Sequence, residues 1–159
     1  MKILFVCKHN RFRSKVAETI FNSLTKSKNL KSESAGLIMD DAHPYIEPIV
    51  LKLVNEKGYE MKNRLPRQLD RRLLGKFDLL IITANDVNPT FFHDVQNINF
   101  GSPKNPKNKI KNKTPGFFGF KKKIFHWKIL DCDCSDSRCI KKSIDEIEVH
   151  IKELIKDLN

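Results

Sequence analysis

A cysteine and an arginine six positions apart are the residues of this sequence best suited to chemistry. Cys7 ends an apolar run, residues 2–6, and Arg13 precedes a segment with helical periodicity. A loop between a buried strand and a helix presents free backbone N–H groups, and the helix dipole favours an anion there. Arg13 adds a planar cation that can bind two oxygens of a phosphate. Because such surroundings favour the thiolate, we expect Cys7 to attack the phosphorus of a bound monoester and form a phosphocysteine.

The other residues of this loop also have types that suit phosphate binding. We expect Ser14 to donate a hydrogen bond to the Cys7 sulfur, which favours that sulfur as nucleophile and as leaving group. Asn10 tolerates left-handed backbone geometry and can brace the loop. The remaining loop residues are Lys8, His9, Arg11 and Phe12. Successive backbone N–H groups in such a loop form a nest for a tetrahedral oxyanion, so the sequence predicts that phosphate, vanadate or arsenate binds there.

The loop resembles the signature of a known enzyme family. Residues 7–14, Cys-Lys-His-Asn-Arg-Phe-Arg-Ser, match the Cys-x-x-Asn-x-x-Arg-Ser pattern of the low-molecular-weight protein tyrosine phosphatases and the related thioredoxin-coupled arsenate reductases. Further matches are Ser34-Ala35-Gly36, Arg67-Gln68-Leu69 and Phe77-Asp78. The resemblance implies a three-layer α/β/α fold with a four-stranded parallel sheet. It also implies a protein-tyrosine-phosphatase that acts on a phosphorylated protein or a small phosphomonoester, with no cofactor.

The resemblance also indicates which residue supplies the proton for the leaving group. The family has an Asp-Pro late in the chain for this purpose, and Asp131 is the matching residue here, with Asp133 as the rival. Cys132 replaces the proline, and the aromatic pair that follows it in eukaryotic relatives is missing. Trp127, Phe117, Phe118 or Phe120 could form a replacement aromatic wall for the substrate, but such residues more often anchor a core or a loop, which is the favoured interpretation here.

Three further cysteines keep a second activity open. Arsenate resembles phosphate in charge and shape, so the same loop serves an arsenate reductase if other thiols relay electrons to thioredoxin. Cys132, Cys134 and Cys139 lie beside the expected acid, where one of them could resolve an oxidised Cys7. We expect all four cysteines of the chain to be reduced thiols. Their spacing is a weak zinc pattern because no fourth ligand matches it, so no metal site is expected.

The strongly basic character of the chain belongs to one segment. The formal net charge is +11, and residues 95–130 contain nine lysines and no acidic residue. We expect a long lysine-rich loop at about 101–123, since this part has neither helical nor strand periodicity. Binding of RNA or an acidic protein there is the third functional alternative, but no recognition-module pattern accompanies the lysines, and a nucleic-acid partner is not expected.

The periodicity of apolar residues predicts an alternation of strands and helices. Strands are expected at 2–6, 30–35, 77–82 and 124–130, and helices at 16–24, 46–54, 67–74, 85–95 and 140–158. Ser14 suits the N-cap of the first helix, and Gly58 suits the end of the second. Strands alternating with helices imply a parallel sheet covered on both faces, with ligands beyond the carboxyl ends of the strands.

The size of the chain and its hydropathy set the remaining expectations. A chain of 159 residues suits one domain, which we expect to span 1–159. No apolar run approaches the roughly 20 residues of a bilayer span, and the run at residues 3–7 is too short for the core of a signal peptide. We therefore expect a cytoplasmic protein with no membrane partner.

Overall fold

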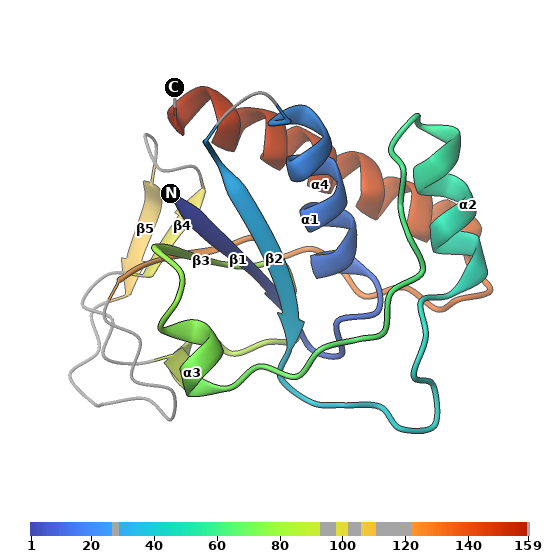
Figure 1. The fold of residues 1–159 in the computed structure, drawn as a ribbon, viewed down its shortest axis with the longest axis horizontal. Coiled ribbons are helices and arrows are strands. Elements are labelled where there is room, and N and C mark those ends of the chain that lie inside the picture. The colour runs from blue at the N-terminus through green and yellow to red at the C-terminus, as the bar shows by residue number, and fades with distance from the viewer. Residues whose placement is uncertain (27–28, 93–97, 102–105, 111–121, 159) are drawn as a thin grey trace.

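The computed structural model describes residues 1–26, 29–92, 98–101, 106–110 and 122–158 (Figure 1). In chain order the elements are β1 (Lys2–Cys7), α1 (Arg13–Leu24), β2 (Lys31–Gly36), α2 (Pro48–Glu56), α3 (Arg71–Leu74), β3 (Leu79–Ile82), the 3-10 helix η1 (Pro89–Phe92), β4 (Ile98–Gly101), β5 (Pro106–Ile110), β6 (Lys123–His126) and α4 (Ser137–Leu158). Most of the expected strands and helices are confirmed to within a few residues. The helix expected at 85–95 is reduced to η1, and residues 93–97 lie outside the described part.

The strands form one sheet in the order β2-β1-β3-β6-β4-β5. The first four strands are parallel, because β1 pairs in parallel with both β2 and β3, and β3 with β6. This confirms the predicted four-stranded parallel sheet. Two further strands continue it, with β4 parallel to β6 and β5 antiparallel to β4.

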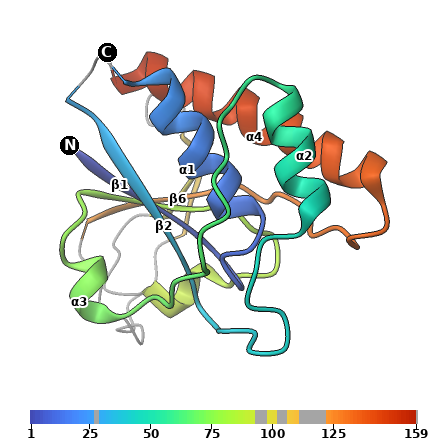
Figure 2. The same cartoon turned by 45° about the vertical axis from the view of Figure 1, so that its right-hand side comes forward.

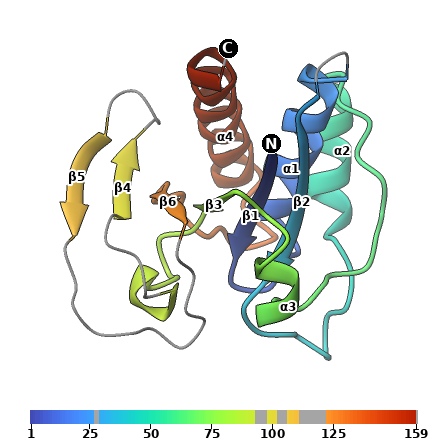
Figure 3. The same cartoon turned by 60° about the vertical axis from the view of Figure 1, so that its left-hand side comes forward.

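The prediction of a lysine-rich loop at about 101–123 is wrong for residues 106–110, because these residues form β5 (Figure 3). Residues 102–105 and 111–121 lie outside the described part. β5 is paired through the backbone onto β4, which in turn pairs with the free edge of β6. Backbone pairing at a sheet edge requires no hydrophobic period, so a pattern-based prediction has no signal for such a strand.

Helices cover both faces of the sheet, which makes the predicted three layers. α1, α2 and α4 lie together on one face, and α3 lies on the other (Figures 1 and 2). Successive side chains of a strand point to opposite faces, so Ile3 and Phe5 pack with α1 and α4 whereas Leu4 and Val6 pack with α3. All four side chains are fully buried, and each such burial stabilises the fold by about 1.5–3 kcal/mol.

The helix α2 begins and ends where its residue types require. Pro48 occupies the first turn of α2, where its missing N–H costs no hydrogen bond. Gly58 follows the C-cap of α2 with φ +85°, a backbone conformation that glycine adopts without strain, as predicted. α4 is amphipathic, and its buried face includes Ile140, Ile144 and Ile147. Within the described residues, no helix combines the length and apolar character that a bilayer span requires.

Candidate active site

The loop from Cys7 to Arg13 joins the carboxyl end of β1 to the start of α1. The Cys7 carbonyl accepts the Leu37 N–H at 3.2 Å, and the Lys8 carbonyl accepts the Ile38 N–H at 2.9 Å. These carbonyls therefore face the chain that follows β2. Asn10 has a left-handed backbone (φ 54°), and its N–H lies 3.3 Å from the Cys7 sulfur. The loop thus turns the Asn10 N–H toward the thiol, as an oxyanion nest requires of its backbone donors.

Asn10 holds the loop from behind through a buried hydrogen-bond network. Its Nδ2 donates to Ser14 Oγ at 2.9 Å and to Ser34 Oγ at 2.8 Å, and its Oδ1 accepts the Arg67 N–H at 2.9 Å. The Ser34 hydroxyl donates to Glu18 Oε2 at 2.6 Å. Asn10 is fully buried, so satisfying both polar ends of its amide avoids the cost of an unpaired buried group. Asn10 is therefore a brace of the loop and does not itself line the cavity described below.

Ser14 has a different position from the N-cap expected for it. The N-cap of α1 is Phe12, which makes no side-chain capping bond, and Ser14 lies inside the helix. Its hydroxyl lies 3.0 Å from the Cys7 sulfur. The N-cap prediction is wrong because the hydroxyl is used by the thiol and by Asn10, whereas the expected contact between Ser14 and Cys7 is present.

Gly36 allows β2 to approach the loop more closely than any other residue type could. Gly36 pairs with Cys7 across the sheet. A Cβ atom at Gly36 would lie 2.7 Å from the backbone nitrogen of Asn10 and 2.7 Å from the backbone carbon of His9. Neither neighbour is a flexible side chain, so only glycine fits without moving the loop.

The Arg13 side chain is buried and held at several points. Its Nη1 lies 2.8 Å from Asp86 Oδ1 and 3.1 Å from Asn85 Oδ1, and its Nη2 lies 3.4 Å from Asp131 Oδ1. Its Nε is buried and has no hydrogen-bond partner in the described part of the chain. A buried guanidinium N–H in that position suits an oxyanion held by the loop. The sequence analysis did not name Asn85 and Asp86 as site residues. Their place just after β3 indicated such a role, because ligands bind beyond the carboxyl ends of parallel strands.

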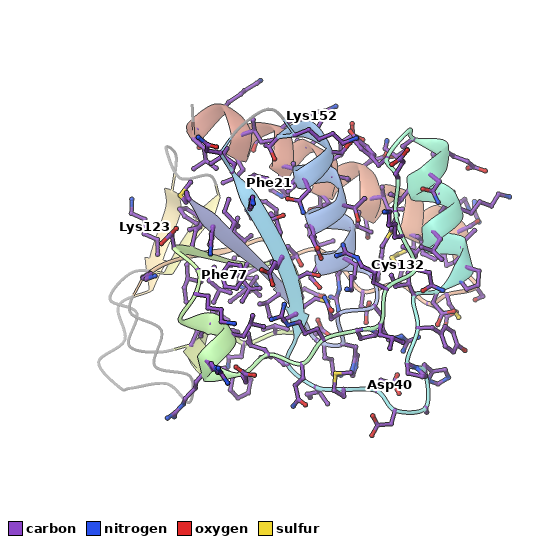
Figure 4. All side chains as sticks on the ribbon, in the orientation of Figure 1. Phe21, Asp40, Phe77, Lys123, Cys132 and Lys152 are labelled. Carbon is purple, nitrogen blue, oxygen red and sulfur yellow. A yellow bond between two sulfur atoms is a disulfide. The ribbon has the colours of Figure 1, made fainter. Side chains whose placement is uncertain are left out.

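A cavity of about 500 Å³ opens above the loop. Cys7 and Arg13 line it together with His9, Arg11, Phe12, Asp40, His43, Tyr45, Glu47, Val50, Asp131, Cys132, Cys134 and Ile140. Figure 4 shows Asp40 beyond the tip of β2 and Cys132 on the same side of the molecule, so the wall combines segments far apart in sequence. Lys8 contributes its backbone to the loop, and its side chain is outside this lining.

The Arg11 guanidinium faces the rim of the cavity. It donates to Asp40 at 2.6 Å, to Glu47, and to the Tyr45 carbonyl at 3.2 Å. These contacts fasten the segment before α2 to the loop. Burial raises the pKa of Asp40, but the neighbouring His43 and Arg11 outweigh it and hold that pKa below its ordinary value. The Arg11 side chain therefore holds the wall of the cavity together, while the backbone N–H groups of the loop remain available to bind the oxyanion.

The two candidate acids differ in position. Asp131 lines the cavity, about half exposed, with Oδ1 3.4 Å from Arg13. Asp133 is outside this lining, and its Oδ1 accepts the Ser135 N–H at 2.8 Å and the Ser135 hydroxyl at 2.6 Å. Those two bonds lower the pKa of Asp133 and hold its carboxylate in a local turn.

The cysteines near the acid are not all free, so the expectation of four reduced thiols is wrong. Cys132 and Cys139 form a disulfide, with their Cα atoms 5.8 Å apart. A turn brings them together, since the Asp136 N–H donates to the Asp133 carbonyl at 3.0 Å. Cys134 is free and exposed, and it lines the same cavity as Cys7. The part of the chain that the structure describes contains no cluster of three or more His, Cys, Asp or Glu that could hold a metal.

Aromatic residues at the cavity are not those that the sequence analysis named. Trp127 is buried in the core, where it packs against Phe5 and stacks on His150. Phe117, Phe118 and Phe120 lie outside the described residues. His43 and Tyr45 line the cavity instead, with their rings in an edge-to-face contact and their centroids 6.4 Å apart. Neither carried a sequence signal, because the segment before α2 has no periodicity that reveals what faces the loop.

The family model of the low molecular weight phosphotyrosine protein phosphatases matches residues 2–159 of this chain. The chain belongs to this family. The matched residues include the loop, the cavity wall and both candidate acids. No curated protein matches the chain in sequence.

Several solved structures resemble this family member over nearly its whole length. An arsenate reductase from Archaeoglobus fulgidus DSM 4304 has 26% sequence identity and a TM-score of 0.65, over 97% of this chain and 98% of the other. The low molecular weight protein tyrosine phosphatase from T. tengcongensis has 21% identity and a TM-score of 0.73, over 99% of both chains. Wzb from Vibrio vulnificus, solved in complex with benzylphosphonate, has 15% identity and a TM-score of 0.67, over 98% and 97%. The two less identical structures show that the fold is shared.

Proposed function

We propose that this protein is a cysteine-dependent phosphomonoester hydrolase of the protein-tyrosine-phosphatase type, with Cys7, Arg13 and Asp131 as its catalytic residues. The observation that carries the proposal is the position of the Cys7 sulfur. It lies 3.0 Å from the Ser14 hydroxyl and 3.3 Å from the Asn10 N–H, in a cavity that Arg13 and Asp131 also line. Nucleophile, oxyanion donors and acid thus face one space.

The reaction proceeds in two steps. The Cys7 thiolate attacks phosphorus, the bond from phosphorus to the leaving oxygen breaks, and Asp131 donates its proton to that oxygen. Asp131 then accepts a proton from water, whose oxygen attacks phosphorus, and the sulfur–phosphorus bond breaks to release phosphate and the Cys7 thiolate. The loop N–H groups and the Arg13 guanidinium stabilise the charge on the equatorial oxygens in both transition states.

Substrate binding involves the whole loop of residues 8–14. The backbone N–H groups of Lys8, His9, Arg11 and Phe12 hold the phosphoryl oxygens, while Asn10 and Ser14 keep the loop and the sulfur in place. Tyr45 and His43 supply an aromatic wall, which supports an aryl phosphate such as phosphotyrosine in a protein. Phosphate, arsenate and vanadate are the expected inorganic ligands. We also propose a cytoplasmic location, which cell fractionation tests.

Hydrolysis of para-nitrophenyl phosphate by the purified protein tests the proposal. Cys7→Ser should abolish turnover, and Arg13→Ala should nearly do so, because each removes a group that contacts the reacting phosphoryl group. Vanadate should inhibit competitively. Lys62→Ala, at an exposed position outside the cavity, is the matched control and should retain full activity. Comparable turnover in all of these proteins would refute the assignment.

A second activity, arsenate reduction, is favoured by Cys134, whose exposed thiol shares the cavity with Cys7. The Cys7 thiolate would displace hydroxide from arsenate to form a sulfur–arsenic bond. The Cys134 thiolate would then attack the Cys7 sulfur, so that arsenic takes the bonding electron pair and leaves as arsenite, and thioredoxin dithiol would reduce the resulting disulfide. Cys134→Ser separates the two activities, because it should abolish arsenate turnover and spare phosphate ester hydrolysis.

A further inference from the structure

Lys15 is a buried cation that the proposed chemistry does not use. It lies in the first turn of α1 and is only 6% exposed. It has no hydrogen bond or ion pair with any residue that the structure describes. Burial lowers the pKa of Lys15, and the nearby Glu18 carboxylate raises it only in part. The helix dipole also disfavours a cation at this end of α1, so an anion near the ammonium would relieve two unfavourable effects.

The Lys15 side chain lines a second cavity, of about 250 Å³. The cavity is lined by Lys15, Glu18, Glu33, Ser34, Arg64, Leu65 and Arg67. Among the described residues, it shares no lining residue with the cavity above Cys7. It is therefore a separate site.

The charges of this second cavity are arranged so that one cation is left over. Arg64 pairs with Glu18 at 2.8 Å, and Arg67 pairs with Glu33. Glu18 also accepts the Ser34 hydroxyl at 2.6 Å, so both of its oxygens are engaged. The ammonium of Lys15 is the remaining charge. The described wall thus has an excess of one positive charge, which matches a monoanion.

The class of anion follows from the other groups of the wall. A phosphate monoester carries about −1.5 to −2 charges near neutral pH. This is more negative charge than the one unpaired cation balances, and Glu18 and Glu33 would repel the remainder. A carboxylate carries one charge. Leu65 is 76% exposed at the same cavity, and it offers an apolar contact to a short hydrocarbon chain beside the carboxylate.

We propose that this second cavity binds a carboxylate, with its oxygens on Lys15 and its hydrocarbon chain on Leu65. Two sources share this chemistry, a free short-chain acid and the side chain of a glutamate in a partner protein. Arg64 and Arg67, each paired with a glutamate of the wall and partly exposed, leave Lys15 as the cation for either source. The site does not depend on the function proposed above, because no group of the Cys7 cavity takes part.

Titration of the intact, isotope-labelled protein with sodium butyrate tests the site by amide NMR, with sodium chloride at matched ionic strength as the reference. We expect saturable shifts at the amides of Lys15, Ser34 and Arg67, with a dissociation constant on the order of 1 mM for so small a ligand. Lys15→Met, which keeps an unbranched apolar side chain of nearly the same length, should weaken binding at least about tenfold. Lys62→Met, exposed and outside the cavity, should not.

A second variant keeps the test informative if Lys15→Met fails to fold. Leu65→Ser changes a mostly exposed side chain, so the fold should survive, and it should weaken butyrate more than acetate because only butyrate reaches Leu65. A peptide with a single central glutamate is titrated in parallel. Shifts with the peptide alone would assign the site to a protein partner, and shifts with butyrate would assign it to a free acid. Shifts confined to residues 7–14, shifts equal to those with sodium chloride, or shifts unchanged in Lys15→Met and Leu65→Ser would overturn the proposal.

Discussion

The Ser14 hydroxyl lies 3.0 Å from the Cys7 sulfur and accepts a hydrogen bond from Asn10 Nδ2 at 2.9 Å. Because the Ser14 oxygen already accepts the Asn10 amide, the hydroxyl proton is available for donation to the sulfur. A thiolate is the form of Cys7 that benefits from such a donor. The contact thus links the brace of the loop to the group proposed as nucleophile.

Ser14→Ala should lower kcat for para-nitrophenyl phosphate about 10- to 100-fold, the range expected when a hydrogen bond to a charged group is lost. The loss should appear in the breakdown of the phosphocysteine as well, because the sulfur leaves in that step. Rapid-quench measurement of both steps checks this. Ser32→Ala removes another buried serine hydroxyl, one bonded to Asn22, and should leave kcat unchanged. An equal loss in both variants would mean that Ser14 acts only through stability.

Gly36→Ala should weaken vanadate inhibition at least about tenfold, because a Cβ 2.7 Å from the loop backbone forces the loop to shift and misplaces its donors. Gly75→Ala is the matched control, since a Cβ there meets nothing closer than 3.6 Å. Inhibition constants for the two variants provide the measurement. Wild-type affinity in Gly36→Ala would show that the loop adapts without cost.

The sequence predicted the loop and its neighbours well because their signals are local. The apolar run of β1, the periodicity of α1 and the residue types between them lie within a few turns of each other. The partners of the loop are remote: Ser34 meets Asn10, and Glu18 meets Ser34, only through the packing of β2 against α1. The N-cap prediction for Ser14 is wrong because α1 already begins at Arg13, which puts Ser14 inside the helix. The Cys132–Cys139 pairing required the path of a turn that no pattern specifies.

Asp131→Asn should slow hydrolysis of an alkyl phosphate about 10²- to 10⁴-fold and of para-nitrophenyl phosphate much less, because a poor leaving group depends most on the proton. Asp133→Asn should have little effect on either substrate, since its carboxylate is bonded to Ser135. Turnover of both esters by both variants decides between the two acids. A larger loss in Asp133→Asn would exchange their roles.

Glu148 of α4 pairs with Lys57, the C-cap of α2, at 2.8 Å, and this link between the two helices should make stability depend on acid pH. Burial raises the pKa of Glu148, but hydrogen bonds from Lys152, Lys57 and Tyr59 outweigh it and lower that pKa from 4.5 to about 2. A depressed carboxyl pKa stabilises the fold above pH 4.5, and this contribution is lost as the pH falls from 4.5 to about 2.

Glu148→Gln should therefore lower the free energy of unfolding at pH 7 by about 1 kcal/mol, and the gap from wild type should shrink in acid. Urea unfolding between pH 7 and pH 2 measures both effects. Glu56→Gln alters an exposed carboxylate 3.9 Å from Lys52 and should change the unfolding free energy far less. A gap that stays constant with pH would contradict the assignment of the titrating group.

Cys7 lies at the end of β1, a strand with a parallel neighbour on each side and a fully buried interior. Amide hydrogens of such a strand exchange with solvent only when the whole domain opens, whereas those at a sheet edge exchange through local opening. The thiol is therefore anchored to a strand whose amide hydrogens we expect to exchange most slowly. The β4–β5 hairpin lies at the other edge of the sheet from β2. Opening of that hairpin would leave the loop, its brace and the cavity intact, so the lifetime of the site follows the stability of the central sheet.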